Sequence, residues 1–381
     1  MPAPTPVLTD VLPRAAVVHD WLTVPGGSEK VVVAMLDLLP GADIYTSVYD
    51  PEPWRDLLAG HRIRTSLLDR IPGARTNYPK LLPLMNRAFE SFDLAGYDLV
   101  ISSSHSCAKN VLTPVQTLHV CYCHTPMRHA WEPAYLDAEP LGTLARLGAR
   151  ALGPRLRRDD LAGASRPDHF IANSSFVAQR IAKYYRRSAT VIHPPVDVAA
   201  HLDRARDPED YYLILGRVVP YKRIDLALAA CARLGRRVKV VGTGRALDGA
   251  RAAAGPAAEF LGFVPDDELG PILAGARALL FPGAEDFGIV PVEAQAAGLP
   301  VIAYGAAGVR DSIIDGRTGI FFAQQSVAAV TDAILEFEER SFDEAEIRDN
   351  ARRFGPERFR EELAEFVRDA HATTNDRMVV A

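Results

Sequence analysis

Short apolar runs alternate with helix-like segments along almost all of the 381 residues, and this alternation restricts the possible folds more than any other feature. Such runs occur at 15–18, 99–102 and 118–123, and the pattern restarts at 211–215 and 238–241. A strand that leads through a helix to another strand forms a parallel sheet with right-handed crossovers. We therefore predict an α/β protein built on parallel sheets.

The restart of the pattern indicates two domains. A chain of 381 residues is too long for one ordinary hydrophobic core. The double proline Pro194-Pro195 and the polar run 203–210 mark a linker between the halves. The sequence thus predicts domains at residues 1–197 and 198–355 and a last helix within 356–381.

Composition excludes several classes of protein. A formal net charge of −5 argues against a dedicated nucleic-acid binder. No apolar run approaches the roughly 20 residues that span a bilayer. The four cysteines form no disulfide framework, so we expect a cytoplasmic protein. Residues 141–164 are expected to be helical, and the arginines over 146–158 could touch an anionic membrane surface. Gly153-Pro154 breaks the pattern of this patch and two aspartates dilute its charge, which favours a solvated face.

The stretch 283–293 carries two carboxylates around a predicted helix start. Glu285 falls in the turn after the apolar run 278–281, and Glu293 lies about two turns further on, inside the helix. The first N–H groups of a helix are unpaired and can bind a ligand. Carboxylates accept hydrogen bonds from hydroxyl groups and repel phosphates, so this arrangement suits a sugar or ribose. The stretch alone fits a capping acid and a solvated helix glutamate equally well.

Two cations share the loop after the run at 211–215. Arg217 and Lys222 suit an anionic ligand, because a guanidinium can bind two phosphate oxygens at once. Taken with the two glutamates, they indicate a diphosphate joined to a hydroxyl-rich group, which is a sugar nucleotide.

Two further segments are ambiguous when read alone. His124 follows the strand-like run 118–123, with Arg128 and Trp131 nearby, and fits a catalytic and a structural role equally well. The glycine pair Gly26-Gly27 comes between a predicted strand and helix, where a tight structural turn is the simpler interpretation.

Five motifs, in their order along the chain, resemble glycosyltransferase family 4. Glu285 and Glu293, with seven residues between them, match the E-x7-E signature of that family. Residues 216–222 match its diphosphate loop. Segments 19–22, 26–30 and 123–128 look like the corresponding segments of bacterial members that act on envelope polysaccharides, mannosyltransferases among them. The matches cover nearly the whole chain, from about residue 19 to 319.

The resemblance implies the GT-B arrangement, in which two Rossmann-like domains face each other across a cleft and the last helix crosses back to the first domain. It implies that Arg217 and Lys222 hold the donor diphosphate and that Glu285 binds the donor sugar. His124 would approach that sugar from the first domain, and Glu293 would bind the ribose. The remaining donor contacts would come from Gly26, Gly27, Phe263 and Val264, and from the backbone N–H groups of Phe287, Gly288 and Ile289.

The resemblance also implies a retaining, metal-independent transfer without a cofactor. GDP-mannose is the favoured donor, with UDP-linked glucose or N-acetylglucosamine as the alternative. The expected acceptor is a saccharide or a lipid-linked saccharide, which would place the enzyme at the inner face of the plasma membrane. A scaffold subunit that binds nucleotide sugars without catalysis, a nucleotide-sugar epimerase and a glycogen-type phosphorylase are the competing hypotheses. An epimerase would need no acceptor, and a phosphorylase would need a lysine for pyridoxal phosphate, for which the sequence offers no candidate.

Overall fold

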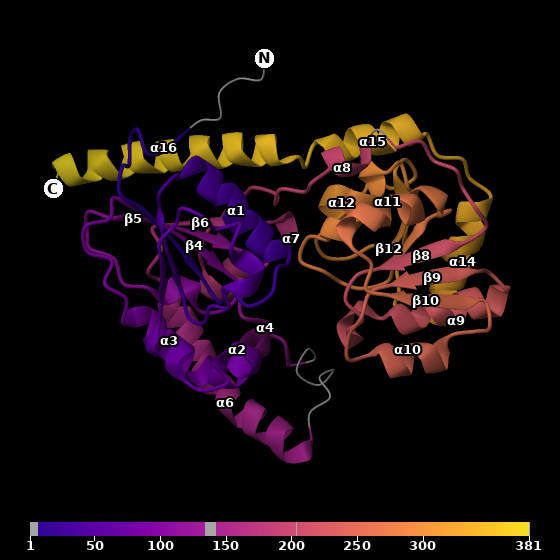
Figure 1. Ribbon diagram of the computed structural model, residues 1–381, viewed down its shortest axis with the longest axis horizontal. Coiled ribbons are helices and arrows are strands. Elements are labelled where there is room, and N and C mark those ends of the chain that lie inside the picture. The colour runs from indigo at the N-terminus through magenta and orange to yellow at the C-terminus, as the bar shows by residue number, and fades with distance from the viewer. Residues whose placement is uncertain (1–6, 134–141, 203, 381) are drawn as a thin grey trace. The chain divides into compact units, whose positions relative to one another are not determined.

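The computed structural model describes residues 7–133, 142–202 and 204–380, and the chain forms two compact units (Figure 1). Unit 1 contains Met1–Pro195 and Pro356–Ala381, and unit 2 contains Val196–Gly355. The polypeptide therefore enters unit 2 directly after the double proline. It returns to unit 1 at the start of its last helix.

Unit 1 is built on a seven-stranded parallel sheet with the strand order β3-β2-β1-β4-β5-β6-β7. Neighbouring strands pair in register, for example Val17 of β1 with Ile44 of β2 and with Ile101 of β4. The strands are short, and the inner ones are almost wholly buried, as expected for a parallel sheet that is covered on both faces, whereas the edge strands Ile63–Thr65 and Thr190–Val191 are mostly exposed. They are β1 (Ala15–His19), β2 (Asp43–Thr46), β3 (Ile63–Thr65), β4 (Leu99–Ser104), β5 (Leu118–Cys123), β6 (His169–Ala172) and β7 (Thr190–Val191).

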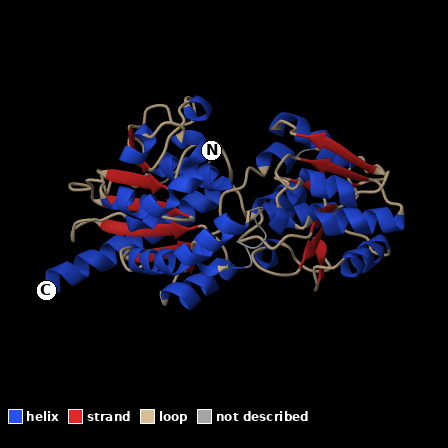
Figure 2. Ribbon diagram, turned by 90° about the horizontal axis from the view of Figure 1, so that it is seen from below, coloured by secondary structure: helices blue, strands red, loops and turns tan. Residues whose placement is uncertain are grey.

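Helices cover both faces of this sheet, as the secondary-structure colouring of Figure 2 makes visible. Val17 and Ile101 point into one core, and their neighbours Val18 and Val100 point into the other. The longer helices of unit 1 are α1 (Gly27–Leu38), α3 (Leu82–Glu90), α6 (Thr143–Gly163), α7 (Ser175–Tyr185) and α16 (Pro356–Val380).

The last helix, α16, belongs to unit 1. It begins at Pro356, because proline is well tolerated in the first turn of a helix. Phe359, Leu363 and Val367 recur every four residues, so they share one face, and all three are buried in the same core as Val17. The helix lies against α1 and β5.

The helix expected over residues 141–164 is confirmed where the structure describes it, and α6 continues through Pro154. A proline inside a helix removes one hydrogen bond and costs about 3 kcal/mol. The contacts beyond it oppose that cost: Leu156 is buried in the core, and Arg157 donates to the carbonyl of Ala130 at 2.9 Å. Asp160, further along the helix, is fully buried.

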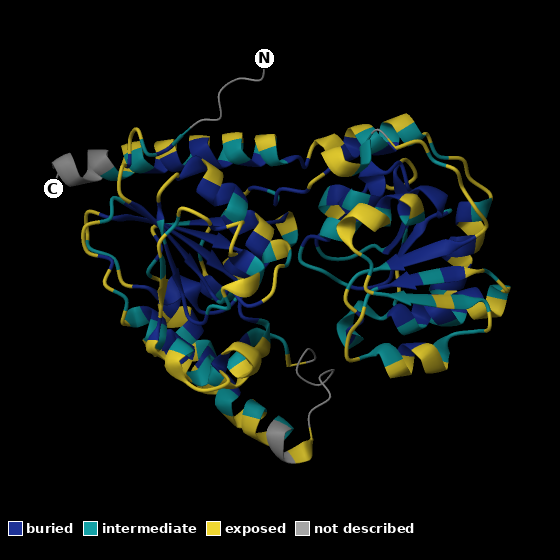
Figure 3. Ribbon diagram, in the orientation of Figure 1, coloured by how far each residue is buried: buried dark blue, intermediate teal, exposed yellow. Residues whose placement is uncertain are grey.

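Unit 2 contains a six-stranded parallel sheet with the strand order β10-β9-β8-β11-β12-β13. Most of its strands are buried and dark in Figure 3, whereas the edge strand Ala258–Gly262 is intermediate to exposed. The strands are β8 (Tyr212–Leu215), β9 (Val238–Val241), β10 (Ala258–Gly262), β11 (Leu279–Phe281), β12 (Val301–Tyr304) and β13 (Gly319–Phe322). The helices that flank it include α9 (Ile224–Leu234), α11 (Asp266–Gly275), α12 (Ile289–Ala296), α14 (Val327–Glu338) and α15 (Glu344–Arg352).

The polar run 203–210 is not a linker, which corrects the prediction. Its described residues pack on unit 2: the N–H groups of Asp207 and Glu209 donate to the carbonyls of Ala274 and Gly275, and Arg348 donates to the carbonyl of Arg204. Charged side chains made the run look like a solvated connection. Its backbone is nevertheless paired with α11 and α15.

Candidate active site

The two candidate sites lie at equivalent places in the two sheets. The strand order reverses between β1 and β4 in unit 1 and between β8 and β11 in unit 2. At such a switch point, the loops after the two strands leave in opposite directions and open a crevice at the carboxyl ends, where α/β proteins bind ligands. The predicted residues of unit 2 and a cluster of histidines in unit 1 fall on these loops.

In unit 2 the structure brings a predicted cation and a predicted acid into contact. Lys222 lies on the loop after β8 and Glu285 on the loop after β11, and Lys222 Nζ is 2.9 Å from Glu285 Oε1. The side chains are only 12% and 20% exposed. Glu285 Oε1 is buried, and apart from this ion pair no described donor makes a well-aligned hydrogen bond to it. That oxygen can accept a further bond from a ligand hydroxyl.

Neighbouring groups keep the Lys222 side chain protonated. Burial has the largest single effect and lowers the pKa of the ammonium group, and the charge of Arg217 lowers it further. The carboxylate of Glu285, helped by Tyr221, outweighs both and raises the pKa above its ordinary value. Lys222 is therefore charged at neutral pH. Arg217 is exposed on the same loop and lies close enough for its charge to act on Lys222.

Glycines allow the loops around this ion pair to touch through their backbones. A Cβ on Gly283 would lie 2.9 Å from Lys222 Cα, and a Cβ on Gly308 would lie 1.9 Å from the carbonyl oxygen of Asp286. The N–H of Gly308 donates to the carbonyl of Glu285 at 2.9 Å. The loop that carries Glu285 is thus fixed from two sides, and only glycine fits at either place.

Helix α12 begins directly beyond this loop. Gly288 is its N-cap, in the left-handed region at φ 91°, and Ile289 is its first residue. The side chain of Phe287 is buried against Phe354, with ring centroids 5.5 Å apart, so only the backbone of Phe287 remains for a ligand. Glu293 is partly exposed and lies about 6 Å along the helix from Ile289.

Phe263 and Val264 lie further away, after the edge strand β10. Phe263 is 77% exposed, whereas Val264 packs partly into the core of unit 2. Three strand spacings separate β10 from β11, which is about 14 Å. These residues therefore do not join the cluster around Glu285, and one ligand that touched both places would have to be elongated.

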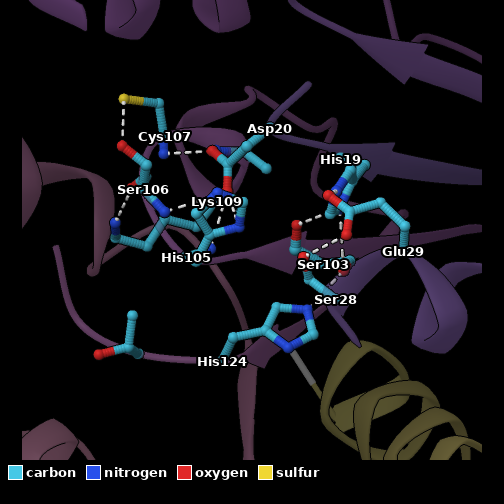
Figure 4. A network of polar contacts seen from close by, with 12 residues as sticks. His19, Asp20, Ser28, Glu29, Ser103, His105, Ser106, Cys107, Lys109 and His124 are labelled. Atoms are coloured by element: carbon cyan, nitrogen blue, oxygen red, sulfur yellow. Dashed lines mark hydrogen bonds and ion pairs between the residues drawn. The ribbon is translucent and has the colours of Figure 1, made fainter. Parts of the chain in front are cut away.

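In unit 1 the predicted residue His124 is buried directly after β5. Its Nε2 lies 2.8 Å from Ser103 Oγ, at the end of β4 (Figure 4). Burial, followed by the charges of His105 and His19, lowers the pKa of His124 to about 3. His124 is therefore neutral at physiological pH and offers one ring nitrogen as donor and one as acceptor.

Next to Ser103, the structure places a buried ion pair that the sequence did not predict. His19 ends β1, and its Nε2 lies 3.2 Å from Oε1 of Glu29 in α1. Burial raises the pKa of Glu29, but the hydrogen bond and charge of His19 outweigh it, and the pKa falls to about 2. Ser28 Oγ donates to the other carboxylate oxygen at 2.8 Å. Glu29 is ionised at all physiological pH values.

Gly26 has a structural reason to be glycine. A Cβ there would lie 2.9 Å from Glu29 Oε2, so a larger residue would displace that carboxylate. Gly26 is the N-cap of α1 and Gly27 is the exposed first residue of the helix. The predicted approach of this pair to a donor stays a prediction.

Asp20 is a second missed residue, and it fixes the loop after β4. Its two carboxylate oxygens accept from the backbone N–H groups of residues 105–108 at 2.5–3.0 Å. His105 Nδ1 lies 3.2 Å from the same carboxylate. Burial would raise the pKa of Asp20, but the charges of His105 and His19 and the hydrogen bonds lower it overall. The sequence did contain a signal for this contact. Asp20 and residues 105–108 each follow a strand-like run, and a Rossmann-like strand order places those two strands side by side.

Trp131, which the sequence grouped with His124, has a structural role. Its Nε1 donates to Asp160 at 2.6 Å, and its ring stacks on Tyr184 with centroids 4.8 Å apart. Arg128 lies 4.0 Å from Glu132. Within the described ranges, no group of three or more histidine, cysteine or acidic side chains could hold a metal ion. The same ranges contain no helix that is long and apolar enough to cross a membrane.

Several solved structures have a fold similar to that of this protein over nearly its whole chain. HepE of Anabaena, solved with UDP and glucose, has a TM-score of 0.64 at 15% identity, covering 92% of this chain and 98% of that one. Sucrose-phosphate synthase of Thermosynechococcus elongatus has 0.67 at 18%, covering 94% and 100%. The lipopolysaccharide outer core galactosyltransferase WaaB has 0.64 at 15%, covering 93% and 99%. The protein has the GT-B fold, with two Rossmann-like domains.

Sequence families identify the class more narrowly than the fold does. The family described as Glycosyltransferase Family 4 matches residues 25–200, and the one described as Glycosyl transferases group 1 matches residues 203–354. Together they cover most of both units, and the chain belongs to glycosyltransferase family 4. No curated protein sequence matches it.

Proposed function

We propose that this glycosyltransferase is a retaining hexosyltransferase that uses a nucleotide sugar, with GDP-mannose as the favoured donor. The acceptor is a saccharide or a lipid-linked saccharide of envelope polysaccharide synthesis. The observation that carries the proposal is the contact of Lys222 with Glu285, beside Arg217, at the switch point of the unit 2 sheet. A charged lysine next to a carboxylate with a free acceptor site suits a diphosphate that is joined to a sugar.

In this mechanism Arg217 and Lys222 bind the donor diphosphate and stabilise the negative charge that develops as the nucleotide leaves. Glu285 accepts hydrogen bonds from hydroxyls of the donor sugar, and the N–H groups at the start of α12 bind beside it. Glu293 binds the ribose, and the backbone at Phe263 lines the base pocket. We expect no metal and no cofactor, because the two cations do the electrostatic work that a divalent ion would do.

His124 has a different part, because its pKa of about 3 makes it a poor proton donor at neutral pH. A neutral imidazole can still hydrogen-bond to an uncharged sugar. We propose that His124 binds the donor sugar in this way. Gly26 and Gly27 leave room for the donor or acceptor next to the loop after β1.

The enzyme would act in the cytoplasm, at the inner face of the plasma membrane, where a lipid-linked acceptor is located. The arginines in the segment 146–158 of α6 are the candidate contact with anionic lipid. Binding to vesicles that contain anionic lipid, compared with neutral vesicles, tests this contact, and equal binding to both would contradict it.

A UDP-sugar is the alternative donor, and the structure of HepE with UDP and glucose favours it. The experiment is a panel of nucleotide sugars incubated with the purified enzyme, with release of the free nucleoside diphosphate as the readout. We expect GDP from GDP-mannose; UDP from UDP-glucose or UDP-N-acetylglucosamine would establish the alternative. Release from no donor, with or without saccharide acceptors, would favour a scaffold subunit. NMR of the product should show retention of the anomeric configuration, and inversion would contradict the mechanism.

A further inference from the structure

A continuous path of polar contacts connects Glu29 to His124 inside unit 1 (Figure 4). Glu29 Oε1 lies 3.2 Å from His19 Nε2. His19 Nδ1 lies 3.1 Å from both the carbonyl oxygen and Oγ of Ser103. Ser103 Oγ in turn lies 2.8 Å from His124 Nε2. His19 and Ser103 are fully buried, so water does not compete for these contacts.

The donors and acceptors along this path can be assigned from chemistry. An ionised carboxylate only accepts, so His19 Nε2 carries a hydrogen towards Glu29. A backbone carbonyl also only accepts, so His19 Nδ1 carries a hydrogen towards Ser103. His19 therefore donates from both ring nitrogens, to the carboxylate of Glu29 on one side and to Ser103 on the other. The neighbouring residue Asp20 is a second carboxylate close to this ring.

The hydrogen on His19 Nδ1 decides where the hydroxyl of Ser103 points. Ser103 Oγ accepts from His19 Nδ1, which leaves its own hydrogen free to be donated. The partner within reach is His124 Nε2, which must then be the acceptor. A neutral histidine whose Nε2 accepts carries its hydrogen on Nδ1. Among the described residues, none hydrogen-bonds to His124 Nδ1.

We propose that Glu29, His19 and Ser103 are positioning residues that fix His124 in its Nδ1–H tautomer. His124 then presents a hydrogen-bond donor, and not a lone pair, at its free nitrogen. The use of that N–H towards the donor sugar rests on the proposed function, whereas the tautomer itself does not. If Glu29 loses its charge, we expect His19 Nδ1 to accept the hydroxyl hydrogen of Ser103 in place of donating to it, and His124 must then reverse its tautomer.

The test is nitrogen NMR of the full-length enzyme labelled with 15N-histidine, at about pH 7 and without donor; His124→Gln assigns the signal. Wild type should show His124 with its proton on Nδ1. Both Ser103→Ala and Glu29→Gln should shift it to the Nε2–H form that free neutral histidine prefers. Ser102→Ala is the matched control, because it removes the same type of contact from His119, at 2.9 Å on the same two strands, and should leave His124 unchanged.

An Nε2–H form of His124 in wild type would overturn the assignment. An Nδ1–H form that persists in both Ser103→Ala and Glu29→Gln would overturn the relay. In the transfer assay the two variants should lower kcat/KM about tenfold, as for one lost hydrogen bond, and Ser102→Ala should match wild type. If the tautomer reverses but kcat/KM does not change, the proposed use of His124 fails while the tautomer assignment stands. If no nucleotide sugar is turned over, the NMR result still decides the tautomer.

Discussion

Because His119 and His124 are both neutral in the folded protein, we can predict how much the free energy of unfolding decreases in weak acid. Both imidazoles are buried, and burial lowers the pKa of each to about 3. In the unfolded chain the pKa of histidine is about 6.5. The unfolded state therefore binds the proton first, and folding stability is lost as the pH falls below about 6.5, down to about 3.

The size of the effect follows from these two values. At about pH 5.5 the protonated form of the imidazole in the unfolded chain exceeds the neutral form roughly tenfold, and this protonation stabilises the unfolded state by about 1.4 kcal/mol. At about pH 7.5 the same stabilisation is only about 0.1 kcal/mol. Each histidine thus costs the folded state about 1.3 kcal/mol over this interval. The ionised carboxylates contribute almost nothing here, because in the unfolded chain they titrate near pH 4.

Urea unfolding followed by tryptophan fluorescence measures the free energy of unfolding of unit 1 selectively. All three tryptophans, Trp21, Trp54 and Trp131, belong to that unit. His119→Gln keeps an amide near Ser102 and removes the titrating ring. The free energy of unfolding of wild type minus that of the variant should decrease by about 1.3 kcal/mol from about pH 7.5 to 5.5. His124→Gln should behave in the same way. A difference that stays constant over this interval would refute the reasoning.

Three further predictions concern single residues. Asp20→Ala leaves four backbone N–H groups without their acceptor and should lower the free energy of unfolding by at least about 4 kcal/mol in the same urea assay; a loss below about 1 kcal/mol would contradict the role of Asp20. Lys222→Ala removes a charge from the leaving diphosphate and should lower kcat about 10²- to 10³-fold in the nucleotide-release assay, and a kcat near that of wild type would argue against this role. Gly308→Ala forces its Cβ against the carbonyl of Asp286 and should displace the Glu285 loop, with a fall in turnover of at least about tenfold; normal turnover would show that the loop accommodates the methyl group.

The sequence predicted much of the fold because its signals are local. Alternating strand and helix patterns gave two parallel sheets, and the spacing of Glu285 and Glu293 placed them before and inside α12. The helix after Pro356 was also predicted. Each of these depends on residues that are close together in the chain.

The parts that were missed depend on contacts between distant segments. The run 203–210 looked like a linker because its charges are visible in the sequence and its pairing with α11 is not. His19 and Asp20 are separated by more than eighty residues from Ser103 and from residues 105–108, and only the adjacency of β1 and β4 brings them together.

The central claim is that the loop of Arg217 and Lys222 binds the diphosphate of a nucleotide sugar. Calorimetric titration of the enzyme with GDP and with UDP tests it most directly. Arg223 is the matched control, because it belongs to the same loop but pairs with Asp225 at 3.2 Å. We predict that Arg217→Ala weakens binding of the preferred nucleotide about 10- to 100-fold and that Arg223→Ala leaves it unchanged. Wild-type affinity in Arg217→Ala, or equal losses in both variants, would contradict the account.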